Sequence, residues 1–161
     1  MLGLKEEHIL LIDSAHDAME VINLLSQTLE EGGYVKQSFR QAVWEREQSM
    51  PTGLELSGEI HAAIPHADVE HVNSPALAVA ILKEPIPFKC MVEPEKDIPV
   101  RLVFLLAMNE PKKQIEMLQE VATILQDSTL VQKIASVSSR KEVVELLTKD
   151  QSPSLGVTTS T

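Results

Sequence analysis

The sequence is poor in cysteine, aromatic residues and basic residues, and each shortage excludes a class of protein. The single cysteine, Cys90, permits no internal disulfide and favours a reducing compartment. With 24 acidic against 14 basic residues, the chain lacks the clustered lysine and arginine that binding to nucleic acid requires. Aromatic residues make up only 3%, so a folded core must be built mainly from aliphatic side chains.

Long apolar runs are also missing. The longest, from Leu102 to Met108, has seven residues and is far too short to cross a bilayer. The first 20 residues carry five acids, which is unlike the basic start of a signal peptide. We therefore expect a cytoplasmic protein without direct membrane insertion. At 161 residues it has the length of one compact domain.

The negative charge is unevenly distributed. Residues 101–161 carry seven acids and seven bases, so the whole acidic excess lies in the first hundred residues. We interpret this excess as a solvated surface. The functional alternative is an electrostatic field that attracts a basic partner protein. Nothing in the sequence is typical of a dimer interface, and we expect a monomer.

The order of the predicted elements indicates an α/β fold with a central sheet and helices on both sides. Short apolar runs typical of buried strands lie at 8–12, 61–64, 76–82 and 100–108. Helical spacing of apolar residues predicts helices at about 15–31, 37–48, 111–125, 128–134 and 139–147.

The boundaries of these elements follow from capping residues and prolines. Asp13 and Ser14 offer N-cap oxygens to the first helix, which Gly32-Gly33 ends. Residues 83–99 hold four prolines, and we expect a loop there with at most a short strand at 87–92. The domain is predicted to span residues 1–149, and the small, polar segment 150–161 is predicted to be a disordered tail.

Three histidines at intervals of five, His61, His66 and His71, raise the possibility of a metal site. Successive strand residues point to opposite faces, so His61 and His66 would point apart on one strand. No spacing in the sequence matches a zinc signature, and we predict no metal. A metal-dependent hydrolase that uses these histidines and Asp68 remains the alternative.

His66 is the strongest candidate for chemistry. It follows Pro65 at the end of a predicted strand, where sites gather in open α/β sheets. The proline fixes its own φ and extends Ile64, which positions the histidine that follows. A neutral imidazole offers one unprotonated nitrogen as a nucleophile. Taken alone, His66 is more typical of an ordinary loop histidine bonded to a backbone carbonyl.

An ordered series of short motifs resembles a known family. The series comprises Gly33-Tyr34-Val35, then Arg46-Glu47 with Thr52-Gly53-Leu54, then Ala62-Ala63-Ile64-Pro65-His66. It is similar in order and spacing to enzyme IIA components of the phosphoenolpyruvate-dependent sugar phosphotransferase system (PTS), mannitol/fructose class. The resemblance covers roughly residues 8–148. The segments 51–54 and 66–72 look most like galactitol-type members.

The resemblance implies a fold and an activity. The fold is a mixed sheet of about five strands flanked by helices on both faces. The activity is that of a phosphotransferase without a cofactor, which carries the phosphoryl group on Nε2 of His66 as tele-phosphohistidine. The group would come from the phosphocarrier protein HPr and pass to a cysteine of an enzyme IIB subunit. From there it would reach galactitol or a related sugar in a membrane IIC subunit. The alternative is a IIA-type regulatory module that senses phosphorylation and transports nothing.

The resemblance also implies roles for other residues. Arg46 corresponds to the site arginine, whose guanidinium can hold phosphoryl oxygens through paired hydrogen bonds. His71 would contact the phosphoryl group or orient His66, and Thr52 would offer it a hydroxyl or shape the turn. Mannitol-type members carry a second site histidine where Gln114 falls here, so the resemblance gives no firm two-histidine site. The second nitrogen of His66 needs a fixed acceptor, either a backbone carbonyl or Asp68.

Overall fold

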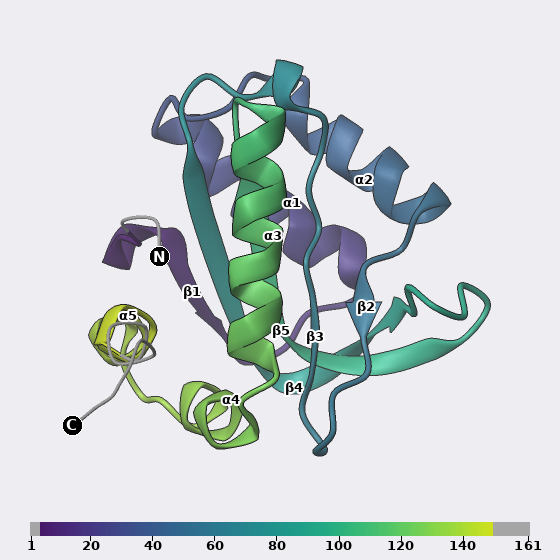
Figure 1. Cartoon of the computed structure of the whole chain (residues 1–161), viewed down its shortest axis with the longest axis vertical. Helices are drawn as coiled ribbons and strands as arrows, with labels where there is room; N and C mark the ends of the chain where they lie inside the picture. The colour runs from purple at the N-terminus through teal and green to yellow at the C-terminus, as the bar shows by residue number, and fades with distance from the viewer. Residues whose placement is uncertain (1–3, 150–161) are drawn as a thin grey trace.

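A computed structural model describes residues 4–149, and the predicted tail at 150–161 lies outside the described residues. Its centre is a five-stranded mixed sheet with the strand order β1-β4-β5-β3-β2 (Figure 1). The strands are β1 (Ile9–Ile12), β2 (Gly53–Leu54), β3 (His61–Ala63), β4 (Ala76–Lys89) and β5 (Asp97–Ala107). Two pairs, β1 with β4 and β3 with β5, are parallel, and the other two are antiparallel. The predicted α/β class and mixed sheet are confirmed.

Helices cover both faces of the sheet. One layer holds α1 (Ala18–Glu31) and α2 (Phe39–Ser49), and the other holds α3 (Pro111–Leu125), α4 (Ser128–Ala135) and α5 (Arg140–Lys149) (Figure 1). Successive strand side chains point to opposite faces. Ala78 and Ala80 of β4 therefore join the core under α1 and α2, whereas Leu77 and Val79 join the opposite core. Within residues 4–149, no helix is long and apolar enough to cross a membrane.

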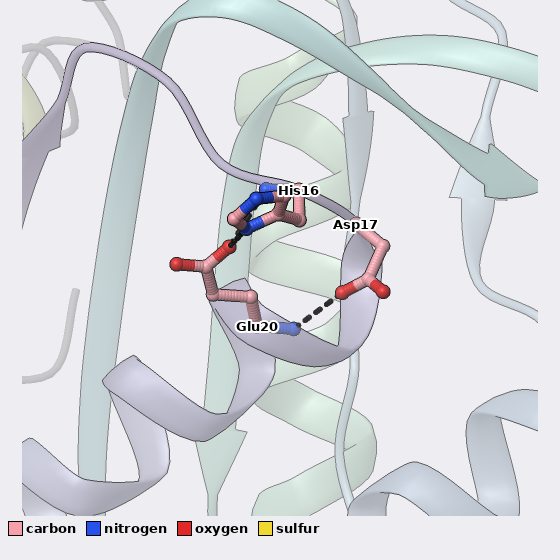
Figure 2. Close-up of polar contacts among 3 residues, drawn as sticks. All are labelled: His16, Asp17 and Glu20. Carbon is pink, nitrogen blue, oxygen red and sulfur yellow. Dashed lines mark hydrogen bonds and ion pairs between the residues drawn. The ribbon is translucent and has the colours of Figure 1, made fainter.

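The first helix begins later than its predicted caps. The Asp17 carboxylate accepts a hydrogen bond from the backbone N–H of Glu20 at 2.9 Å (Figure 2). The Glu20 carboxylate reaches back and accepts from the backbone N–H of His16 at 2.7 Å. This reciprocal arrangement satisfies free N–H groups at the helix start. The expectation that Asp13 or Ser14 caps α1 was therefore wrong. The helix ends as predicted, because Gly33 has the positive φ of 81° that glycine tolerates.

The proline-rich segment is a long hairpin instead of a loop. Strand β4 continues to Lys89 and β5 already begins at Asp97, with a shift in register between Ile81 and Ile86. Beyond this shift, buried Ile86 and Phe88 alternate with exposed residues. Two prolines lie opposite each other in the ladder and lack the N–H that a hydrogen-bonded pair would use. The loop was predicted from the number of prolines, without regard to this alternation of buried and exposed residues.

One histidine of the first segment lies in the core. His8, at the end of a short 3₁₀ turn (Glu6–His8), is only 3% exposed. Its ring meets that of Tyr34 edge to face, with 5.0 Å between the ring centroids. Burial lowers the pKa of His8, which keeps the ring uncharged in its apolar surroundings.

Candidate functional site

His66 is held beside the end of the central strand β5. Strand β3 stops at Ala63, and Ile64 and Pro65 lead the chain onward. The carbonyl of Pro65 accepts a hydrogen bond from the backbone N–H of Leu106 at 3.1 Å, and His66 forms an isolated parallel bridge with Leu106. The histidine therefore sits at a strand end, as the sequence predicts, and 8% of its surface is exposed.

The ring of His66 is fixed in one tautomer. Its Nδ1 lies 2.9 Å from the backbone carbonyl oxygen of Ile64. A carbonyl oxygen only accepts, so Nδ1 carries the hydrogen and Nε2 carries the lone pair. The sequence left two acceptors open for this nitrogen, a backbone carbonyl or Asp68, and in the structure the acceptor is the backbone carbonyl of Ile64. Nε2 makes no hydrogen bond to any residue between 4 and 149, which leaves its lone pair available.

The surroundings of His66 favour the neutral ring. Burial lowers the pKa of His66 below its ordinary value, and the positive charge of Arg46 lowers it further. The hydrogen bond to Ile64 and the negative charge of Asp68 act in the opposite direction but are outweighed. A neutral imidazole at pH 7 is the nucleophilic form.

Arg46 offers an uncommitted donor near this ring. It lies in the last part of α2, and its charge reaches both His66 and Glu47. Its Nε is buried and has no hydrogen-bond partner among the described residues. A buried donor without an acceptor is unfavourable, and an anionic oxygen would satisfy it. Two of the predicted site residues, His66 and Arg46, therefore lie within range of electrostatic interaction.

Thr52 lies behind the histidine in a buried hydrogen-bond chain. Its hydroxyl donates to Oε1 of Glu47 at 2.9 Å, and its backbone N–H donates to Oε2 of the same carboxylate at 2.9 Å. The hydroxyl oxygen also accepts from the backbone N–H of Ile64 at 3.1 Å. Thr52 is 3% exposed. Its hydroxyl hydrogen is already committed, so in this arrangement it has none to donate to a phosphoryl oxygen.

The other two histidines of the series have their own partners. Nδ1 of His71 lies 2.8 Å from the hydroxyl oxygen of Ser38, and its Nε2 lies 3.9 Å from a carboxylate oxygen of Glu70. Nδ1 of His61 accepts from the backbone N–H of Leu56 at 2.9 Å. Within the described part of the chain, no three histidine, cysteine or carboxylate side chains are grouped to hold a metal ion. The geometry thus gives no support to the metal-dependent hydrolase.

Gln114 lies on α3, at the position where the resemblance places a second histidine in mannitol-type members. Its Oε1 is buried and without a hydrogen-bond partner among residues 4–149. A glutamine side chain offers two N–H donors and one oxygen acceptor, and it carries no charge at any pH. It can therefore hydrogen-bond a phosphoryl oxygen but cannot take the nucleophilic role of an imidazole.

Glu47 occurs in the Arg46-Glu47 motif, but no role was predicted for it from the sequence. Phe39, Val43 and Glu47 recur at every fourth residue of α2 and are all buried, so they share its inner face. The signal was therefore present, because a carboxylate on an otherwise apolar stripe must find hydrogen-bond donors inside the protein. The role of Ile64 could not be found in this way, since it acts through its backbone atoms.

Comparison with known proteins gives a consistent result. The family model for the phosphoenolpyruvate-dependent sugar phosphotransferase system, EIIA 2, matches residues 3–150. The mannitol-specific EIICBA component of Escherichia coli (strain K12) is 30% identical over 147 residues, or 91% of this chain, which spans only 22% of that relative's length. The galactitol-specific EIIA component of the same strain is 29% identical over 122 residues, or 75% of this chain and 79% of that protein.

Solved structures agree with this fold. In the complex of enzyme IIA mannitol with phosphorylated enzyme IIB mannitol from Escherichia coli, the matching chain has a TM-score of 0.76 and 30% identity, covering 91% of this chain and 97% of that one. The crystal structure of IIA mannitol from Escherichia coli has a TM-score of 0.74 and 30% identity, covering 89% and 98%. The chain therefore belongs to the EIIA 2 family and is a phosphotransferase component of a sugar PTS, working through a phosphohistidine intermediate.

Proposed function

We propose that Nε2 of His66 accepts the phosphoryl group from the phosphohistidine of HPr and passes it to a cysteine of an enzyme IIB subunit. One observation carries this proposal. The Ile64 carbonyl holds the hydrogen on Nδ1, so the lone pair is on Nε2, and the same ring feels the charge of Arg46, whose buried Nε–H has no partner among the described residues. The IIA mannitol protein of Escherichia coli has been solved in complex with its phosphorylated IIB, which supports the same order of transfer here.

The transfer needs positioning and charge stabilisation more than covalent chemistry. The migrating group resembles metaphosphate, with charge spread over three oxygens and the two nitrogens roughly in line. As the bond from phosphorus to Nε2 forms, the bond to the HPr nitrogen breaks, and its electron pair returns to the HPr ring. His66 keeps its hydrogen on Nδ1, bonded to Ile64, so the phosphorylated ring is cationic. When the IIB thiolate attacks phosphorus next, the electron pair of the P–N bond returns to Nε2, and the cationic ring departs as a neutral imidazole, which is a good leaving group.

Arg46 holds the phosphoryl oxygens in this account. Its Nε–H and terminal N–H groups can form charge-assisted hydrogen bonds to two oxygens at once. His71, whose Nδ1 lies 2.8 Å from the hydroxyl oxygen of Ser38, would contact the phosphoryl group or orient His66, as the resemblance implies. The buried contacts of Thr52 support a positioning role for its hydroxyl instead of the contact with phosphate that the resemblance implied.

The sugar is galactitol or a related sugar alcohol. The galactitol-specific EIIA component supports this assignment, because the chain spans 79% of that relative's length. The partner IIB and IIC subunits would make the contact with the sugar. Growth on galactitol and on mannitol, after deletion of the gene and its return on a plasmid, tests the assignment. Loss of growth on galactitol alone supports it, and loss on mannitol alone contradicts it.

Labelled phosphoenolpyruvate, supplied with enzyme I and HPr, tests the transfer. We expect one acid-labile phosphoryl group per chain, none in His66→Ala, and onward passage to a IIB cysteine. His16→Ala is the matched control, because His16 is an exposed histidine on the approach to α1 and contacts Glu20 (Figure 2). Stoichiometric labelling of His66→Ala would refute the site. Label that stays on the chain or only returns to HPr would indicate the regulatory module instead.

A further inference from the structure

A buried chain of hydrogen bonds connects helix α2 with the ring of His66. It starts at the carboxylate of Glu47, which accepts from both donors of Thr52, and continues from the Thr52 hydroxyl oxygen to the N–H of Ile64. The carbonyl of Ile64 then accepts from Nδ1 of His66. Every contact in this chain is between 2.9 and 3.1 Å. Ile64 is thus held at both of its backbone polar atoms.

We infer that Glu47 is a positioning residue for phosphoryl transfer, which acts through Thr52 and Ile64 to hold the tautomer and orientation of His66. The inference rests on the proposed function, because it assigns a task to a residue that does not touch the reacting atoms. Glu47 is only 5% exposed and occupies a position of α2 that an apolar side chain could fill, as Phe39 and Val43 do.

Burial of a carboxylate is unfavourable, and burial raises the pKa of Glu47. The hydrogen bonds from Thr52 and the charge of Arg46 oppose that rise. Both oxygens of Glu47 accept from Thr52, so they fix the side-chain rotamer and direct the hydroxyl hydrogen. The hydroxyl then has only lone pairs to turn toward Ile64, whose N–H must donate.

The position of Thr52 explains why this support is needed. Gly53 of β2 pairs with Ala63 of β3, which places Thr52 next to the point where β3 ends. The N–H of Ile64 lies just beyond that end and is bonded by the Thr52 side chain instead of a neighbouring strand. Without Thr52 in this rotamer, a buried N–H would lose its partner and Ile64 would be free to move. The carbonyl that fixes the tautomer of His66 belongs to this same residue.

Two adjacent residues of helix α2, Arg46 and Glu47, have different proposed tasks. Successive residues on a helix are about 100° apart, because one turn holds about 3.6 residues. Arg46 exerts its charge on His66, while Glu47 points toward Thr52. One helix therefore positions both the group proposed to bind the phosphoryl oxygens and the group that supports the nucleophile.

The test compares Glu47→Gln, Thr52→Val and Thr52→Ser with the unaltered chain. An amide has only one accepting atom, so Glu47→Gln keeps at most one of the two bonds from Thr52. Thr52→Val removes the hydroxyl at nearly constant shape, and Thr52→Ser restores it. Glu45→Gln is the matched control, because Glu45 is exposed on the same helix and its substitution changes the charge equally.

Two quantities are measured on each variant. The first is the tautomer of His66 in the unphosphorylated chain, from ¹⁵N NMR of the ring nitrogens. The second is the single-turnover rate of phosphoryl transfer from phospho-HPr. For Glu47→Gln we expect loss of the pure Nδ1–H tautomer and a rate lower by on the order of tenfold. Thr52→Val should lower the transfer rate at least as much. The rates of Thr52→Ser and Glu45→Gln should stay within about twofold of the rate of the unaltered chain.

The outcomes separate the inference from the proposed function. An unchanged tautomer and rate in a folded Glu47→Gln variant would overturn the inference while leaving the function intact. If Glu47→Gln does not fold, the Thr52→Val and Thr52→Ser pair decides, and equal rates in that pair would overturn it. If the unaltered chain takes no label from phospho-HPr, the proposed function fails. The tautomer measurement would then still show whether Glu47 holds His66.

Discussion

The guanidinium of Arg46 and the imidazole of His66 lie close enough for the arginine charge to lower the pKa of the histidine. The two residues come from different elements, the end of α2 and the segment after β3. The same charge that keeps the ring neutral before transfer is positioned to attract phosphoryl oxygens during transfer. Charge and hydrogen-bonding geometry can be separated, because lysine supplies the first without the second.

Replacement of Arg46 should therefore have two distinguishable effects. Arg46→Gln removes the charge, so the pKa of His66 should rise, and the rate of phosphoryl acceptance should fall by roughly 100-fold. Arg46→Lys keeps the charge and should leave the pKa nearly unchanged, yet it should still slow transfer, because lysine lacks the planar donor pair. NMR titration of His66 and single-turnover transfer measure the two effects. An Arg46→Lys variant as fast as the unaltered chain would contradict the role given to the guanidinium.

The lowered pKa of His66 also predicts how stability depends on pH. Below about pH 6.5, the ordinary value, His66 in the unfolded chain binds a proton that the folded chain does not yet bind. Stability is therefore lost as the pH falls from that value toward the lower folded pKa. The His66→Gln variant lacks this loss of stability at low pH. The titration of His8 and Glu47 contributes equally in the variant and in the unaltered chain, so it cancels in the comparison.

Urea unfolding at pH 7.5 and pH 5.5 checks this sign. The free energy of unfolding of the unaltered chain, relative to that of His66→Gln, should be smaller at the lower pH. A relative free energy that grows on acidification would mean that the folded site raises the pKa of His66.

Gly53 should not tolerate a larger side chain. A Cβ at this position would lie 2.5 Å from the carbonyl oxygen of Lys89 and 3.1 Å from Cδ1 of Ile98. The first neighbour is backbone of the β4–β5 hairpin and can yield only if the strands shift. Gly53→Ala should lower the free energy of unfolding by about 1–3 kcal/mol. Gly58→Ala, where a Cβ would meet nothing within 4 Å, is the control for denaturant unfolding. Equal stabilities of the two variants would contradict this packing.

The start of α1 gives a prediction that distinguishes the structure from the sequence interpretation. Asp17 caps the helix, while Asp13, an exposed residue, was the expected cap (Figure 2). Asp17→Ala should lower the free energy of unfolding by about 1 kcal/mol. Asp13→Ala should change it by less than about 0.5 kcal/mol, as is usual at the surface. Thermal unfolding of both variants measures the difference, and a larger effect at Asp13 would restore the original interpretation.

Much of the architecture could be predicted because it depends on patterns within short segments. The apolar runs at 76–82 and 100–108 form the centre of the sheet, where both faces are covered by helices. The hairpin beyond Leu82 could not be predicted from its prolines, since their tolerance depends on which strand residue lies opposite. His66 and Arg46 were predicted from a motif. Glu47 was missed because its importance depends on a contact with Thr52, which only the fold brings about.

The proposed transfer is tested most directly by identifying which ring nitrogen of His66 carries the phosphoryl group. The uniformly ¹⁵N-labelled chain, phosphorylated by enzyme I, HPr and phosphoenolpyruvate, can be examined by ³¹P–¹⁵N coupling in NMR spectra. We expect one phosphoryl group, coupled to Nε2 of His66, with Nδ1 still protonated and bonded to the Ile64 carbonyl. Phosphorus on Nδ1 of His66, or on any other residue, would contradict it.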